Sequence, residues 1–237
     1  MLSKIIFVLI LCLPTFAGES RRVLLLTPSN TVTFRGEVNY ESVTAAQLKL
    51  AEQVAIRGNK SYTIYLVIDS PGGDIDAGED LIQFAKRIKN LETVGLFAAS
   101  MGSAIIEALP GKRYATESSV YMFHRAKGQF RGQFENGEVE ARLALSKLIV
   151  RNMEVRNAKR LGISIEEYKS KVINELWALG DGLVKQGMAD EIIDLDCSPA
   201  LTNSREHLMT QNLFGVDDMT FSGCPLIRSP IVEGKSK

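Results

Sequence analysis

The sequence predicts an α/β fold in which parallel strands are covered by helices. Short apolar runs of strand length alternate with longer segments whose apolar residues have helical spacing. The strongest strand candidate is 64–68, bounded by Ser61 and by Ser70-Pro71, and a shorter one is 23–26. A segment with helical spacing, 42–57, lies between them, and this strand–helix–strand order is typical of parallel sheets.

The same alternation continues through the middle of the chain. Residues 101–109 are apolar on nearly every side, as in a buried helix, and a polar turn at 116–119 separates two short strand candidates. The expected elements here are, in order, helix 76–91, strand 93–97, helix 101–109, and strands 114–115 and 120–123.

The last third begins with a long charged helix, expected over 137–161 and ended by Gly162. Ser164 and Glu167 have the spacing of a capping box, which predicts another helix. A final short strand is expected at 191–193. Residues 197–237 have weak periodicity, so we expect an irregular C-terminal tail after one domain that covers 18–196.

The first seventeen residues have the layout of a secretory signal peptide. Lys4 precedes nine apolar residues, 5–13, and a small-residue pattern ends at Ala17, the expected cleavage site. Nine apolar residues are too few for a comfortable membrane-spanning helix, which needs about 20. We therefore expect an exported protein, periplasmic or secreted; a membrane anchor formed by this segment is the alternative.

The charge balance and the cysteines indicate the kind of partner and the redox compartment of the protein. The chain has 28 basic and 28 acidic residues, and without the segment that contains Lys4 the balance is 27 to 28. This near-neutral balance favours neither nucleic acid nor a membrane surface as a partner. Cys197 and Cys224 lie in the C-terminal segment, and such a pair in an exported protein predicts a disulfide. Two free thiols in a reducing compartment are the alternative.

Ser100 is the candidate nucleophile. It lies where strand 93–97 turns into helix 101–109, in the small-residue run Ala98-Ala-Ser-Met-Gly102. Free backbone N–H groups at a helix N-terminus favour negative charge that develops there. A serine at this place is also a common helix cap, so the motif alone does not establish catalysis.

Two further motifs supply what a nucleophilic serine needs. Ser70-Pro-Gly-Gly73 directly follows strand 64–68, and its glycines can present backbone amides to an oxyanion. His124 follows strand 120–123 and can take the proton of a serine hydroxyl. The alternatives are an ordinary Pro-Gly turn and a structural histidine. The other histidine, His207, lies in the tail and is expected to be exposed.

The order of these motifs resembles the Clp protease proteolytic subunit family over about residues 22–195. The resemblance rests on the strand and glycine turn within 64–78, on the segment around Ser100, and on Met122-Phe-His124. Three further segments resemble parts of that family: Gly111-Lys-Arg113, Gly128-Gln-Phe-Arg-Gly-Gln133 and Gly187-Met-Ala-Asp-Glu-Ile-Ile193.

The resemblance implies the fold shared by Clp proteases and crotonases, with repeated β-β-α units and a protruding long handle helix at 137–161. It implies a serine endopeptidase that hydrolyses extended or unfolded polypeptides as a homo-oligomer, with no cofactor and no metal. Position by position, it implies Ser100 as nucleophile, His124 as general base, and Gly73 and Met101 as the oxyanion-hole amides.

The acid that completes the triad is the position where the chain departs from the family. Glu175 stands where the family has aspartate, and a glutamate can orient an imidazole with a longer side chain. Asp181 and Asn174 are the competing candidates. The family's Gln-Pro after the histidine is replaced by Arg125-Ala126.

Other functions remain open on the same fold. A catalytically decayed scaffold or binding protein would keep the fold, and an acyl-CoA enzyme of the crotonase type would keep the oxyanion amides without using a serine–histidine pair. A serine–lysine dyad with Lys127 or Lys112 fits the pattern less well than His124 does. An ATP-driven unfoldase is not an expected partner of an exported chain.

Overall fold

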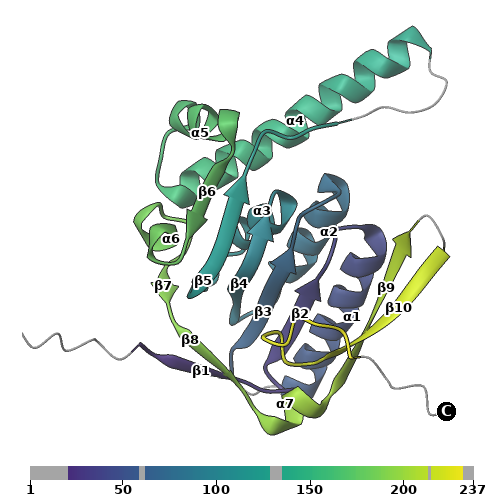
Figure 1. The fold of residues 1–237 in the computed structure, drawn as a ribbon. Helices are drawn as coiled ribbons and strands as arrows, with labels where there is room; N and C mark the ends of the chain where they lie inside the picture. Colours follow the sequence, from purple (N-terminus) through teal and green to yellow (C-terminus); the bar gives the residue numbers. More distant parts are fainter. Residues whose placement is uncertain (1–20, 59–61, 129–134, 213–214, 232–237) are drawn as a thin grey trace, which may run out of the picture.

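A mostly parallel sheet forms the centre of the protein (Figure 1). The structure is a computed structural model that describes residues 21–58, 62–128, 135–212 and 215–231. The sheet has the order β2-β3-β4-β5-β6, and β7 pairs with the start of β5. Its strands are β2 (Thr31–Arg35), β3 (Ile64–Ser70), β4 (Leu91–Ala99), β5 (Arg113–Phe123), β6 (Leu176–Leu179) and β7 (Glu191–Ile192). All neighbours are parallel except β6, which runs antiparallel to β5.

Apolar side chains alternate along β3 between the two faces of the sheet. Ile64, Leu66 and Ile68 join the core under the helices, whereas Tyr65 and Val67 belong to a second apolar cluster on the opposite face. The helices are α1 (Tyr40–Arg57), α2 (Ile75–Ala85) and α3 (Met101–Ala108). The second cluster includes residues of β1 (Val23–Leu26) and the chain next to β8 (Asp194–Cys197), two strands that pair in parallel. The predicted α/β class is confirmed.

A long helix, α4 (Asn136–Leu161), protrudes from this body (Figure 1). It ends at Gly162, whose φ of 74° is the left-handed conformation that favours glycine. Ser164 accepts a hydrogen bond from the Glu167 amide and begins α5 (Ile165–Lys171), as the capping-box spacing predicts. A short 3-10 helix (Val172–Asn174) and α6 (Asp181–Lys185) flank β6.

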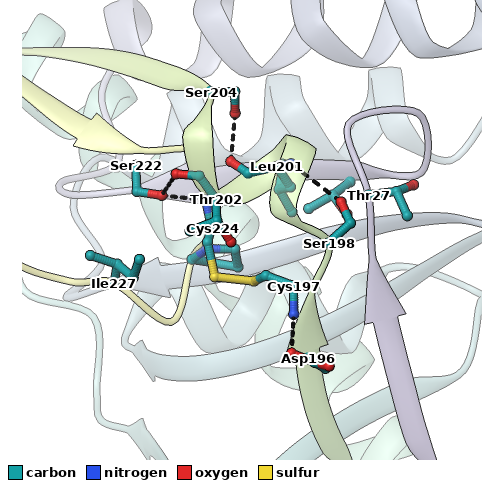
Figure 2. Close-up of a disulfide and its surroundings, with 12 residues drawn as sticks. Thr27, Asp196, Cys197, Ser198, Leu201, Thr202, Ser204, Ser222, Cys224 and Ile227 are labelled. Carbon is teal, nitrogen blue, oxygen red and sulfur yellow. Dashed lines mark hydrogen bonds between the residues drawn. A yellow bond between two sulfur atoms is a disulfide. The ribbon is translucent and has the colours of Figure 1, made fainter.

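The expectation of an irregular segment after residue 197 is wrong. This segment forms α7 (Pro199–Asn203) and an antiparallel hairpin of β9 (Arg205–Asn212) and β10 (Gly215–Ser222). The hairpin lies beside β2 and α1, where the Arg35 guanidinium stacks 4.5 Å above the Phe221 ring and Lys49 pairs with Glu206 at 2.9 Å. A disulfide between Cys197 and Cys224 ties the end of the hairpin to the end of β8 (Figure 2). Tertiary contacts therefore order residues whose own periodicity is weak.

Several other element boundaries differ from the prediction. The two short strands at 114–115 and 120–123 are one strand, β5, whose register against β4 shifts between Gly95 and Phe97, and the polar residues 116–119 lie at this shift. The helix expected over 76–91 ends at Ala85, and the sequence pattern missed β2, β6 and β8.

Two predicted segments lie outside the described residues: the signal peptide at 1–17, and residues 129–133 of the glycine–glutamine motif. Within the described part of the chain, no helix has the length and apolar character needed to cross a membrane.

Candidate active site

Ser100 occupies a strained turn between β4 and α3. Its φ of 53° and ψ of −118° are rare for a residue other than glycine, and such strain is often found at functional positions. Two hydrogen bonds tie this turn to β5: the Ser100 amide donates to the Met122 carbonyl at 2.9 Å, and the Ser103 hydroxyl donates to the same carbonyl at 2.9 Å. The serine is therefore held beside the end of β5, where His124 follows.

His124 stands within hydrogen-bond distance of the serine. Its Nε2 atom lies 2.7 Å from the Ser100 hydroxyl oxygen. Both residues are partly exposed, so a substrate can reach them. This arrangement allows the imidazole to accept the hydroxyl proton when the serine attacks. The structure thus brings together the two residues that the sequence singled out from separate elements.

The glycine turn after β3 supplies the first candidate amide for an oxyanion. Val38 bridges this turn, donating to the Gly72 carbonyl and accepting from the Asp74 amide, each at 2.8 Å. In an extended chain, alternate backbone groups point to opposite sides. The N–H and C=O groups of Gly73 consequently face away from Val38. A Cβ atom at Gly73 would collide with the Val38 carbonyl, and its φ of 150° is also unfavourable for other residues.

Met101 supplies the second candidate amide. It is the first residue of α3, so its N–H has no acceptor within the helix. Gly72 passes close to it: a Cβ atom at Gly72 would lie 2.7 Å from the Ser100 Cβ and 2.9 Å from the Met101 amide nitrogen. Only a glycine allows this approach, which brings the Gly73 turn next to the start of α3.

The predicted acid does not contact the histidine in this structure. The Glu175 carboxylate accepts a hydrogen bond from the indole of Trp177 at 3.0 Å, and both residues are exposed. The Nδ1 atom of His124 is buried and has no hydrogen-bond partner among the described residues. The β5–β6 ladder pairs Phe123 with Leu176, so Glu175 is the next residue in register toward His124. Its φ of 64° turns the chain at this point.

Neither of the competing candidates for this role, Asp181 and Asn174, forms a hydrogen bond with His124 Nδ1. Asp181 begins α6 and forms an ion pair with Arg21 at 3.8 Å, and Asn174 is an exposed residue of the 3-10 helix. Of the candidate dyad lysines, Lys112 pairs with Glu191, whereas Lys127 lines the cavity next to Ser100.

A cavity of about 200 Å³ opens beside the Ser100–His124 pair. Gly73 and Met101 also line it, together with apolar residues from α2, α3, β5 and α4. Two polar residues in its wall, Asn157 of α4 and Tyr168 of α5, were not among the predicted site residues. Their signal was weak, because each is one polar position on an otherwise ordinary amphipathic helix.

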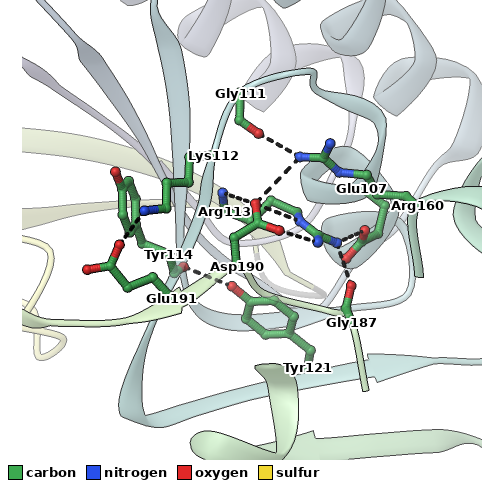
Figure 3. Close-up of polar contacts among 10 residues, drawn as sticks. All are labelled: Glu107, Gly111, Lys112, Arg113, Tyr114, Tyr121, Arg160, Gly187, Asp190 and Glu191. Atoms are coloured by element: carbon green, nitrogen blue, oxygen red, sulfur yellow. Dashed lines mark hydrogen bonds and ion pairs between the residues drawn. The ribbon is translucent and has the colours of Figure 1, made fainter. Parts of the chain in front are cut away.

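A partly buried ion network anchors the far end of α3 (Figure 3). The Arg113 guanidinium donates to Glu107 at 2.5 Å, to Asp190 at 2.5 Å and to the Gly187 carbonyl at 2.6 Å. Burial raises the pKa of Glu107 to about 8, although the positive charge of Arg113 opposes this shift. For Asp190, burial alone would raise the pKa, but the hydrogen bonds and charge of Arg113 outweigh it and the pKa is lowered. The network fixes α3, which carries the Met101 amide, to the start of β5 and to β7.

The family model described as Clp protease matches residues 22–196, which is most of the chain and includes every site residue named above. No group of three or more histidine, cysteine, aspartate or glutamate side chains in the described part of the chain is placed to hold a metal ion. The matched residues and the mostly parallel sheet lead to one conclusion: the chain belongs to the Clp protease family, a family of peptidases.

Proposed function

We propose that this protein is a serine endopeptidase in which Ser100 is the nucleophile and His124 is the general base. The observation that carries the proposal is the 2.7 Å contact between the Ser100 hydroxyl and His124 Nε2, in a cavity that Gly73 and Met101 also line. The Ser100 oxygen attacks a peptide carbonyl while its proton passes to His124. The oxyanion is stabilised by the Gly73 and Met101 amides, and the leaving amine then takes the proton from His124. In the second half of the reaction, His124 takes a proton from water while the water oxygen attacks the acyl-enzyme carbonyl. The proton then passes from His124 to the Ser100 oxygen as the acid product leaves.

The substrate of this mechanism is an extended polypeptide. Val38 occupies one side of the Gly73 turn, and the backbone groups of Gly73 face the other side. A peptide in strand conformation can pair with those groups and so place its carbonyl at Ser100. A folded protein cannot insert its backbone in this way, which supports unfolded segments as substrates.

Glu175 completes the triad in this proposal after a rotation of its side chain. Its present hydrogen bond to Trp177 is exposed, so breaking it costs little, because water replaces it. The buried Nδ1 atom of His124 lacks a partner, and an unpaired buried donor costs about 1–3 kcal/mol. Exchange of the Glu175–Trp177 contact for one between Glu175 and His124 Nδ1 is therefore favourable. The positive charge that His124 gains during catalysis strengthens the second contact further.

We further propose that the protein is exported and acts as a homo-oligomer, without an ATP-driven unfoldase. The N-terminal sequence and the Cys197–Cys224 disulfide both suit an oxidising compartment. Three leucines on the protruding helix α4 are exposed, Leu143 by 42%, Leu145 by 58% and Leu148 by 56%, and a contact with a second copy would cover them. Light scattering of the purified protein tests the homo-oligomer, because Leu145→Glu and Leu148→Glu should reduce the measured mass.

The activity is tested by incubating the purified protein with an unstructured polypeptide and identifying the fragments by mass spectrometry. Cleavage by the wild type but not by Ser100→Ala or His124→Ala supports the proposal. If the wild type binds the polypeptide and never cleaves it, while Ser100→Ala binds equally well, the protein is a scaffold that has lost catalysis.

A further inference from the structure

The cavity beside Ser100 has apolar walls and one polar pair. Its apolar lining comes from Ile75, Met101, Ala104, Phe123 and Met153. The polar pair, which we define as Asn157 and Tyr168, is almost fully buried, with exposed fractions of 1% and 2%. Buried polar atoms normally have at least one hydrogen-bond partner, so an atom of this pair that has none among the described residues requires an explanation.

Each member of the polar pair has one unused hydrogen-bonding group. The Asn157 side-chain nitrogen donates to the Tyr168 hydroxyl at 3.2 Å. The Asn157 amide oxygen, Oδ1, is buried and has no partner among the described residues. The Tyr168 hydroxyl accepts the bond from Asn157, so its own hydrogen is free to donate. Burial raises the pKa of Tyr168 to about 12, so the hydroxyl keeps this hydrogen at neutral pH. The pair therefore offers one acceptor and one donor side by side.

The position of the cavity determines which substrate residue enters it. The cavity is lined by Ser100, His124, Gly73 and Met101. A substrate carbonyl between the Ser100 hydroxyl and the two amides places the side chain of the same residue next to this opening. The cavity therefore receives the residue on the N-terminal side of the cleaved bond.

The charge of the lining argues against a cationic side chain in the cavity. Lys127 lines it, and no carboxylate does among the described lining residues. A lysine or arginine would be buried without a counter-charge and near another cation, which is costly. A glutamate would bring a second acceptor against Asn157 Oδ1. A neutral side chain that both donates and accepts avoids both costs.

We propose that the cavity selects glutamine at the residue before the cleaved bond, with Asn157 and Tyr168 as the residues that determine this specificity. The glutamine –NH₂ group donates to Asn157 Oδ1, its carbonyl accepts from the Tyr168 hydroxyl, and its methylene groups lie against the apolar walls. This inference rests on the proposed function, because it concerns the substrate of the same site. A site that pairs its buried polar groups with the substrate discriminates strongly against an analogue that leaves them unpaired.

A set of peptides that differ only at this residue tests the inference. Glutamine, glutamate, methionine and lysine have similar lengths and separate hydrogen bonding from charge and shape. We expect kcat/KM for glutamine to exceed that for methionine about tenfold, the effect of two neutral hydrogen bonds. Glutamate and lysine should be poorer still. Equal or better cleavage after methionine, glutamate or lysine would overturn the inference.

Variants of the polar pair test whether these residues cause the preference. The double variant Asn157→Leu/Tyr168→Phe leaves no polar group unpaired, so it should fold and should cleave after methionine in preference to glutamine. Asn152→Leu is the matched control, since Asn152 is an exposed residue of the same helix outside the cavity. A glutamine preference that survives in the double variant would contradict the assignment.

Labelling of Ser100 by a fluorophosphonate separates failure of this inference from failure of the function. A wild type that is not labelled refutes the serine peptidase proposal and this inference with it. A wild type that is labelled and cleaves peptides without regard to this residue refutes the specificity alone.

Discussion

The hydroxyl oxygen of Ser100 lies 2.7 Å from Nε2 of His124, although the two residues follow different strands and are 24 positions apart. The contact depends on the Met122 carbonyl, which accepts hydrogen bonds from the Ser100 amide and the Ser103 hydroxyl. These bonds join the start of α3 to the end of β5, so the serine cannot shift without the histidine. Such positioning is what a serine needs to be activated by a base.

The role of Glu175 gives the first prediction. Glu175→Ala should lower kcat by about 10³–10⁴-fold, because the proposed triad then lacks the carboxylate that orients the imidazole. Trp177→Phe removes the indole N–H that now holds the carboxylate, so this variant should keep or exceed wild-type kcat. Peptide hydrolysis under saturating substrate measures both. Asp181→Asn is the control and should behave as wild type; loss of activity in Asp181→Asn with none in Glu175→Ala would show that the acid has been misassigned.

The glycine turn gives the second prediction. Gly73→Ala should abolish hydrolysis and lower the free energy of unfolding by about 2 kcal/mol or more, because the added Cβ meets the Val38 carbonyl and the conformation is strained. Chemical denaturation and peptide cleavage measure the two effects. Gly128→Ala is the matched control, since no described residue lies within 4 Å of a Cβ there. Normal cleavage by Gly73→Ala would mean that this turn does not bind the oxyanion.

The disulfide gives the third prediction. Its cysteines are 27 residues apart, and closing a loop of that length stabilises a fold by about 3.5 kcal/mol. Cys197→Ser/Cys224→Ser should therefore have a lower free energy of unfolding, measured by denaturant titration without reductant. Addition of reductant should lower the wild type to the same level and leave the variant unchanged. A wild type that is insensitive to reductant and equal to the variant would show that the bond does not form in solution.

The buried Glu107 gives the fourth prediction, a dependence of stability on pH. Because its pKa is raised to about 8 in the folded protein, Glu107 binds a proton more tightly there than in the unfolded chain. Its contribution to stability is present below the unfolded pKa and is lost as the pH rises through about 8. Between pH 6.5 and pH 9 the wild type should lose about 2 kcal/mol that Glu107→Gln does not lose. An equal loss of unfolding free energy in the wild type and in Glu107→Gln between these two pH values, measured by denaturant titration, would rule this out.

Local patterns were sufficient to predict the parts of the fold that have strong periodicity or clear capping. Residues 23–26 and the helix that begins after Ser164 are where the sequence indicated. The C-terminal hairpin was missed because its order comes from contacts with Arg35 and Lys49 and from the disulfide, which no local pattern shows. The strand β6 was missed because its four residues have no strong alternation.

The residues of the site also fall into those that local motifs predict and those that depend on tertiary contacts. Ser100, His124 and the glycine turn lie in short motifs whose order along the chain is informative, so the sequence could bring them together. The orientation of Glu175 could not be predicted, because it depends on a competing contact with Trp177 and on a turn at positive φ. Asn157 and Tyr168 could not be recognised either, since they meet only when α4 and α5 pack around the cavity.

Mass spectrometry of the protein after reaction with a fluorophosphonate tests the central claim most directly. The account predicts one covalent adduct on Ser100 in the wild type and none in Ser100→Ala. Labelling should be lost or greatly slowed in His124→Ala, which keeps the serine but removes its base. A wild type that remains unmodified, or an adduct that persists in Ser100→Ala, would contradict the account.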